Sequence, residues 1–150
     1  MHDTITVTGM VAVEPRAITT AEGLAITSFR LVSTQRRFDR ESGQWVDAGS
    51  NWFTVSAFRG LAGNVAASIA KLDRVIVVGR LKIRSWTAGE RSGVVVDIEA
   101  ESIGHDLTWG TSAFRRTLGR ALPASGSADA TGGSGVTASE AEPGEEVVPF

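Results

Sequence analysis

The chain has 150 residues and no cysteine, which excludes disulfides, thiolate zinc sites and a cysteine nucleophile. Its net charge of −2 averages two unlike parts: residues 1–118 hold 14 Lys/Arg and 12 Asp/Glu, whereas residues 119–150 hold one Arg and five acids. No signal peptide and no membrane-spanning run is evident, so we expect a cytoplasmic protein without membrane contact. A mildly basic core suits a polyanionic partner, although an ordinary domain with a solubilising tail has the same charges.

The first half of the core predicts three strands rich in β-branched and aromatic residues. The first strand covers Thr4–Glu14, and Gly9 within it predicts a bulge or a sharp bend. The second covers Ala25–Arg36 and the third Asn51–Phe58. The turn-rich segment 39–43 between them predicts a projecting hairpin.

The second half begins with a change of period that predicts a helix over Arg59–Leu72. Its apolar stripe consists of Leu61, Val65, Ile69 and Leu72. A fourth strand over Arg74–Trp86 and a fifth over Gly93–Ile103 form a hairpin through the turn at 87–92. Five strands with one helix between the third and fourth predict an all-β, five-stranded Greek-key barrel, the OB-fold, over residues 1–118. A β-sandwich fragment with a decorating helix is the alternative.

Alternation along the strands separates inward from outward side chains. In the third strand the inward set is Phe53, Val55 and Ala57, and the outward set is Trp52, Thr54, Ser56 and Phe58. In the fourth strand Leu81 and Ile83 point one way, and the opposite face carries Arg80, Lys82, Arg84 and Trp86. The second-to-third hairpin adds Arg36, Arg37, Phe38, Arg40 and Trp45.

A surface that interleaves aromatics with cations suits single-stranded nucleic acid, because bases stack on the rings while cations neutralise phosphates. The candidate phosphate contacts are Arg36, Arg37, Arg59, Arg80, Lys82 and Arg84. Burial of the aromatics under the helix or a partner subunit is the alternative for each strand taken alone. The fifth strand has an acidic outer face, formed by Asp97, Glu99 and Glu101, which we expect to repel DNA and to be solvated or paired with another subunit.

Catalysis finds little support in the sequence. His2 and His105 have no neighbouring cluster of metal ligands, and no phosphate-cradling glycine loop opens a helix. We therefore expect no enzyme activity, no metal and no cofactor.

The tail has a different composition from the core. Residues 119–144 are mostly Ala, Ser, Gly and Thr and predict a disordered linker. The chain then closes on a tip formed by Glu145, Glu146, Val147, Val148, Pro149 and Phe150. This acidic tip with an apolar end predicts docking to a basic, pocketed surface of partner proteins.

These features together resemble the bacterial single-stranded DNA-binding proteins, of the actinobacterial type. The motifs that support this resemblance are Ile5-Thr-Val-Thr-Gly9, Phe29-Arg-Leu-Val-Ser33, Asn51-Trp-Phe-Thr-Val55 with Phe58, Val77-Val-Gly-Arg-Leu81 through Arg84-Ser-Trp86, and Gly104-His-Asp-Leu-Thr-Trp-Gly110. The resemblance implies base stacking on Trp52, Phe58 and Trp86, with Phe38 as the fourth candidate. It also implies a nucleoid-associated homotetramer that protects single-stranded DNA during replication, recombination and repair.

The tip departs from the family pattern, because only Glu145 and Glu146 precede the apolar residues. Two alternatives stay open at this point: an OB-fold adaptor that uses the aromatics to bind protein, and a binder of single-stranded RNA. Residues 105–118 are expected to form either a sixth strand at a subunit interface or a loop.

Overall fold

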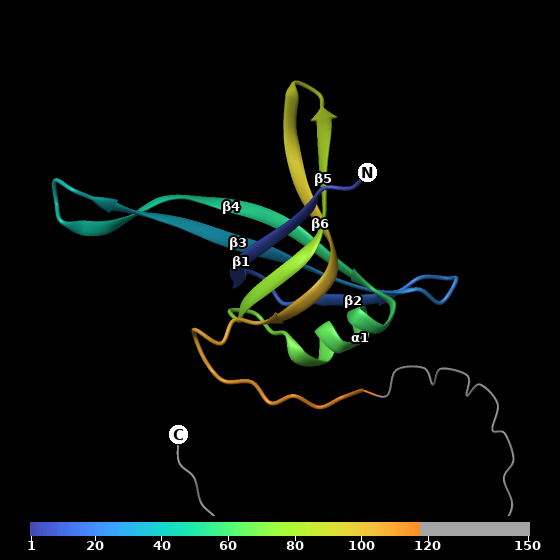
Figure 1. Ribbon diagram of the computed structural model, residues 1–150. Helices are drawn as coiled ribbons and strands as arrows, with labels where there is room; N and C mark the ends of the chain where they lie inside the picture. Colours follow the sequence, from blue (N-terminus) through green and yellow to red (C-terminus); the bar gives the residue numbers. More distant parts are fainter. Residues whose placement is uncertain (118–150) are drawn as a thin grey trace, which may run out of the picture. The chain divides into compact units, whose positions relative to one another are not determined.

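The computed structural model describes residues 1–117, so the predicted linker and tip lie outside the described residues. The elements, in chain order, are β1 (Thr4–Val11), β2 (Arg16–Thr19), β3 (Ala25–Asp39), β4 (Gln44–Phe58), α1 (Arg59–Ser68), β5 (Arg74–Ala88) and β6 (Arg91–His105) (Figure 1).

Five strands close into a barrel in the order β1-β5-β6-β4-β3, and β3 returns to β1. The seam between β1 and β3 is short, with Met10 opposite Val32 and Val11 opposite Leu31. β4 and β6 form a parallel pair, whereas the other pairs are antiparallel. This closed barrel with one helix after β4 confirms the predicted OB-fold rather than the β-sandwich alternative.

The barrel interior holds the inward-facing apolar residues of all five barrel strands. The most deeply buried are Val11, Leu31, Val55, Val75, Val77 and Ile98. Ala57 is also buried and Phe53 packs against this core, which confirms the predicted inward face of β4. The parity of the strand therefore sends Trp52, Thr54, Ser56 and Phe58 to the outside.

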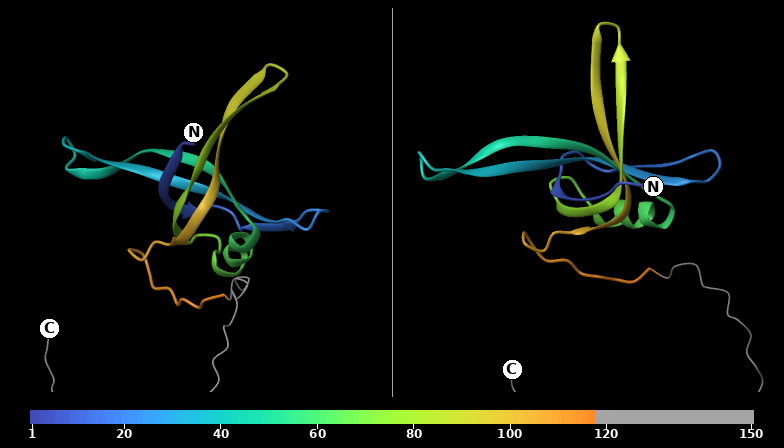
Figure 2. Two further views of the ribbon diagram at one scale, coloured as in Figure 1. Left: turned by 45° about the vertical axis from the view of Figure 1, so that its right-hand side comes forward. Right: turned by 45° about the horizontal axis from the view of Figure 1, so that its top comes forward.

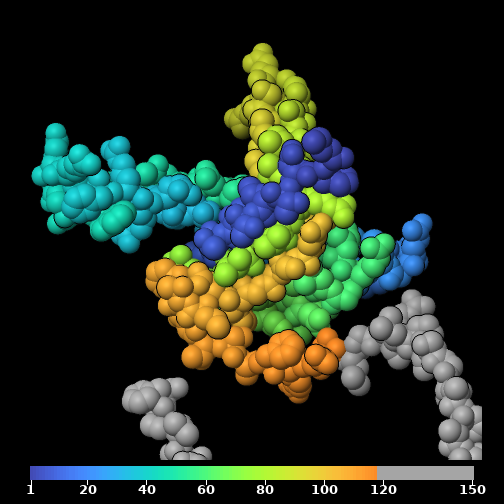
Figure 3. Space-filling model, in the orientation of Figure 1, coloured from blue at the N-terminus to red at the C-terminus, as the bar shows by residue number. Residues whose placement is uncertain are grey.

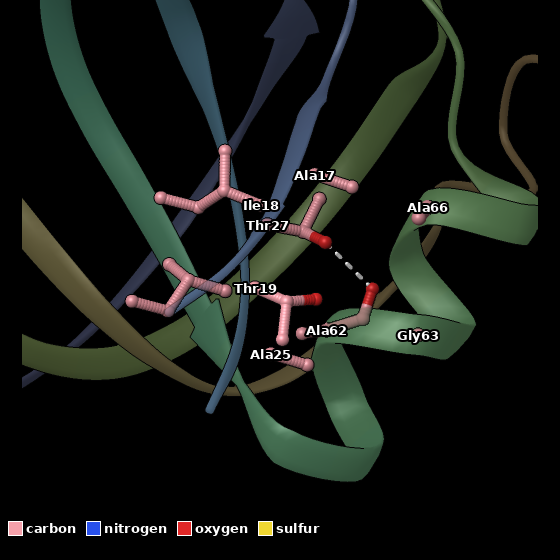
Figure 4. Close-up of a pocket in the computed structure, with 9 residues that line it drawn as sticks. Ala17, Ile18, Thr19, Ala25, Thr27, Ala62, Gly63 and Ala66 are labelled. Carbon is pink, nitrogen blue, oxygen red and sulfur yellow. Dashed lines mark hydrogen bonds between the residues drawn. The ribbon is translucent and has the colours of Figure 1, made fainter. Parts of the chain in front are cut away.

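The helix packs against the barrel through Ala62 and Val65, which are both buried. The hydroxyl of Thr27, on β3, donates a hydrogen bond of 2.8 Å to the carbonyl of Ala62 (Figure 4). A small cavity of about 260 Å³ lies beside this contact, between β2 and α1 (Figure 4). The helix ends at Ser68, earlier than predicted, and Leu72 is 64% exposed with a φ of +77°. Leu72 therefore belongs to the turn that leads into β5 and not to the apolar stripe.

A bulge or a sharp bend was predicted at Gly9, and the bulge is wrong. β1 pairs with β5 without a register shift through Thr8, Gly9 and Met10. Glycine is needed here for another reason, since a Cβ atom at Gly9 would lie 2.5 Å from the carbonyl oxygen of Val32. The missing side chain lets β1 approach β3 and close the barrel.

Four strands run further than the sequence predicted and form two hairpin arms (Figures 1 and 2). The β3–β4 arm consists of residues 34–50, and the β5–β6 arm of residues 80–97. Figure 3 shows that both arms stand clear of the barrel body. Residues 106–117 contain neither helix nor strand, so the described chain has a loop at the place where a sixth strand was considered.

Candidate nucleic-acid interface

The outer face of β4 presents Trp52 in the way that the sequence predicted. Its side chain is 50% exposed, and the guanidinium of Arg30 on β3 lies 5.5 Å from its ring centre. A cation held against an aromatic ring is an attractive arrangement, and it leaves the rest of the ring open to a stacking partner. Phe58 is half-buried at the end of the same strand, so it offers less surface than Trp52.

Arg59 follows Phe58 and begins the helix with a φ of +59°. A non-glycine residue in this left-handed region costs on the order of 1–2 kcal/mol. The side chain is exposed beside Phe58, where a phosphate contact was predicted.

The β3–β4 arm carries an aromatic pair near its tip. Phe38 and Trp45 face each other across the hairpin, with ring centres 5.7 Å apart in an edge-to-face arrangement. Both rings are at least half exposed. Trp45 is therefore at least as accessible as the predicted Phe38, although no role was predicted for it.

The turn of this arm is fixed by Asp39. Its carboxylate accepts hydrogen bonds from the Ser42 hydroxyl and the Glu41 backbone N–H, at 2.7 and 3.2 Å. The Ser42 bond and then the Glu41 bond hold the pKa of Asp39 below its usual value. Gly43 closes the turn with a φ of +67°.

The cations of the β3–β4 arm are largely unpaired. Arg36 lies 3.4 Å from Asp47 in an exposed ion pair. Within residues 1–117, Arg37 and Arg40 take part in no ion pair. These two arginines can meet phosphates without first losing a carboxylate partner.

The β5–β6 arm differs in this respect, because each of its predicted phosphate contacts is bound to an acid of β6. Arg80 pairs with Glu101 at 3.0 Å and Lys82 with Glu99 at 2.7 Å. Arg84 pairs with Asp97. We call these three pairs the ion-pair ladder. The acidic face was predicted to be solvated or paired with another subunit. Glu101 is indeed 48% exposed, but the carboxylates also bind cations of the neighbouring strand, which was not predicted.

Charge and hydrogen bonding in the ladder shift two pKa values. The Lys82 hydrogen bond is the largest influence that lowers the pKa of Glu99. The hydrogen bond to Asp97, followed by its charge, raises the pKa of Arg84. The other oxygen of Asp97, Oδ1, is buried without a hydrogen-bond partner in the described structure.

Trp86 lies across a glycine of the opposite strand. Trp86 pairs with Gly93, and a Cβ atom at Gly93 would lie 2.7 Å from Nε1 and 2.8 Å from Cε2 and Cζ2 of the indole. The side chain is 44% exposed. The Gly93 backbone therefore supports the indole, while the remaining surface of the ring faces solvent.

Strand order separates the predicted aromatics. β6 lies between β4 and β5, with Asp97 opposite Thr54 and Glu99 opposite Ser56. Paired residues share a face, so these acids of β6 lie between Trp52 on β4 and the basic residues of β5 that precede Trp86. The structure therefore places the predicted aromatic and basic residues of β4 and β5 on one side of the sheet, with the acids of β6 between them.

A second, unpredicted cation–aromatic pair lies at the base of the β3–β4 arm. The Arg74 guanidinium is 4.5 Å from the ring centre of Trp109. The pair lines a cleft of about 480 Å³ together with Arg36, Asp47 and Asp106. The His105 ring holds the following loop, with Nδ1 3.0 Å from the Ser112 hydroxyl and Nε2 3.1 Å from Asp73. Strand parity could not find Trp109, because it lies beyond the last strand.

Two negative findings concern residues 1–117. No group of three or more His, Asp or Glu side chains is placed to hold a metal ion there. No helix in this part of the chain combines the length and the apolar character needed to cross a membrane.

Comparisons with known proteins agree with this geometry. The model of the "Single-strand binding protein family" matches residues 2–106. "Single-stranded DNA-binding protein 2" of Tropheryma whipplei (strain Twist) is 56% identical over 112 residues, which cover 75% of this chain and 74% of that protein. "Single-stranded DNA-binding protein 2" of Streptomyces avermitilis is 47% identical over 117 residues, which cover 77% of this chain and 73% of that protein.

Solved structures show the same similarity. The crystal structure of a small single-stranded DNA-binding protein from Streptomyces coelicolor superposes with a TM-score of 0.66 and 42% identity, and covers 73% of this chain and 98% of that chain. The second single-stranded DNA-binding protein of Mycobacterium smegmatis gives a TM-score of 0.58 and 27% identity, with 77% of this chain and all of that chain covered.

Proposed function

Because this chain belongs to the single-strand binding protein family, we propose that it binds single-stranded DNA without sequence preference. It is a binding protein and not an enzyme. The observation that carries the proposal is Trp52, half exposed on the outer face of β4 with Arg30 against its ring. Such a platform stacks any base, while nearby cations neutralise the backbone.

The contacts follow from exposure and charge. Trp52, Trp86 and Phe38 offer open rings for stacking, and Phe58 offers a partly covered one. Arg37 together with Arg36 and Arg59 would meet phosphates. Affinity should therefore fall with salt, because the phosphates release counterions when these cations bind them.

The test is a titration with oligo(dT) that follows tryptophan fluorescence, with matched duplex and oligo(U) as controls. The expected result is strong quenching by oligo(dT) and weak quenching by duplex, which hides its bases. Tighter binding of oligo(U) would favour the RNA-binding alternative. Absence of quenching at low salt, with Trp52→Ala plus Trp86→Ala leaving DNA binding unchanged, would favour the adaptor.

The finer part of the proposal is that the protein protects DNA during replication, recombination and repair, and recruits partner proteins through residues 145–150. The acids there and the apolar end at Pro149 and Phe150 suit a basic, pocketed surface. Deletion of Phe150 should abolish partner binding and spare DNA affinity. Loss of DNA affinity instead would contradict this division of roles.

We also include a homotetramer in the proposal. Large apolar side chains stand exposed in the loop after β6, at Leu107, Trp109 and Phe114, and a second copy of the chain would cover them. Native mass spectrometry at micromolar concentration should give the mass of four chains. A monomer mass at that concentration would contradict the assembly.

A further inference from the structure

The ion-pair ladder places carboxylate oxygens against the cations that a bound phosphate would also use. The Arg80–Glu101 and Lys82–Glu99 separations of 3.0 and 2.7 Å are ordinary lengths for charge-assisted hydrogen bonds. Because these cations donate to acids of the same chain, a DNA phosphate must either share each cation with its carboxylate or displace that carboxylate.

The three pairs share one geometry, which makes them a repeated feature of the arm. Hairpin register sets Arg80 opposite Glu99 and Lys82 opposite Asp97, and each cation reaches the acid two residues beyond its direct partner. The same diagonal joins Arg84 to Asp97. The pairs are solvent-accessible on the cation side, with 43–69% of those side chains exposed, whereas the Asp97 side chain is only 18% exposed.

We propose that Asp97, Glu99 and Glu101 act as internal counterions that compete with single-stranded DNA for the cations of the β5–β6 arm, and that they thereby limit its affinity for DNA. This inference rests on the proposed function. A cation that a carboxylate already neutralises cancels less phosphate charge, so fewer counterions leave the DNA and the cation contributes less to binding and to salt dependence. The acids lie on the same face of the sheet as these cations, so their negative charge would also repel a phosphate bound there.

The test compares two triple variants that change the net charge equally. The ladder variant is Asp97→Asn, Glu99→Gln, Glu101→Gln. The control variant is Glu22→Gln, Glu41→Gln, Glu90→Gln, which removes exposed turn acids that form no ion pair within residues 1–117. Glu41 and Glu90 lie at the tips of the two arms, so the control matches the long-range change in charge.

Binding of oligo(dT) is measured across a salt series for the wild type and both variants. We expect the ladder variant to bind about tenfold tighter or more at fixed salt, with a slope of log K against log salt steeper by up to about 2, as three new phosphate contacts would give. The control should keep the wild-type slope. Equal slopes and affinities in the two variants would overturn the proposal, as would weaker binding by a folded ladder variant.

A double-mutant cycle keeps the test decisive if the triple variant folds poorly. Lys82→Gln should change DNA affinity little in the wild type, but should lower it several-fold in a Glu99→Gln background. The same loss in both backgrounds would overturn the proposal. Failure of the wild type itself to bind oligo(dT) would instead overturn the proposed function, so the two failures are distinguishable.

Discussion

The β3–β4 and β5–β6 arms are built from strands of equal length, 15 residues each, but they differ in how many of their cations are already paired. Within residues 1–117, two of the three arginines of the first arm, Arg37 and Arg40, have no acidic partner, whereas three cations of the second arm are bound to acids of β6. A count of basic residues would rate the second arm at least as attractive to DNA. Availability of a cation depends on what it already binds, and not on its presence alone.

The largest effect should come from the aromatic at the base of the first arm. Trp52→Ala removes a stacking platform, which should cost about 1–3 kcal/mol of binding free energy to oligo(dT). Ile18→Ala is the control, because Ile18 is as exposed as Trp52 but lies on β2, away from the outer face of β4. Equal losses of oligo(dT) affinity in the two variants would contradict base stacking on the outer face of β4.

The second prediction compares the arms directly with equal changes in charge. Arg37→Gln plus Arg40→Gln should weaken oligo(dT) binding and reduce the salt slope by about 1.4, the value for two phosphate contacts to a single strand. Arg80→Gln plus Arg84→Gln should change the slope much less, because those cations are already paired. A larger loss from the second pair would reverse the ranking of the arms.

A smaller effect should follow from the glycine that supports Trp86. Gly93→Ala forces the indole to move, so the emission of Trp86 and its quenching by DNA should change, with a binding loss below that of Trp86→Ala. Gly104→Ala is the control on the same strand, since a Cβ atom there meets nothing within 4 Å. Unchanged emission in Gly93→Ala would mean that the ring is not held by the backbone of β6.

The smallest effect concerns the pH dependence of folding. Lys82 lowers the pKa of Glu99 below the ordinary 4.5, so this pair stabilises the folded chain above that pH and loses its contribution as pH falls through the lowered value. An exposed pair contributes under about 1 kcal/mol. Glu99→Gln should therefore be slightly less stable than wild type to urea at pH 7, and equally stable at strongly acidic pH. A difference that grows on acidification would contradict the assignment.

Much of the barrel could be predicted because alternation and turn residues are local signals. The alternation in β4 sent Val55 and Ala57 inward and Trp52 outward, as the structure has them. β2 was missed because all four of its residues are exposed, so it has no inward set to detect. The closure of β1 onto β3 depends on a close approach between strands distant in sequence, and Gly9 alone does not reveal it.

The ladder was missed although a signal for it existed. The predicted turn at 87–92 was too wide to fix a register, whereas the strands actually continue to Ala88 opposite Arg91. The tight turn at Gly89, with a φ of +63°, sets every later pair, including Lys82 opposite Asp97. The basic face of β5 and the acidic face of β6 were therefore predicted as separate surfaces, although the hairpin places them side by side.

The short seam between β1 and β3 has a consequence for how the barrel opens. Two residue pairs close it, while β5 and β6 remain paired over the full length of their hairpin. Opening the barrel at this seam breaks few strand-to-strand hydrogen bonds. Backbone amides there should therefore exchange with deuterated solvent sooner than those of the β5–β6 pair. The barrel can thus uncurl at one edge into a sheet before its strands separate.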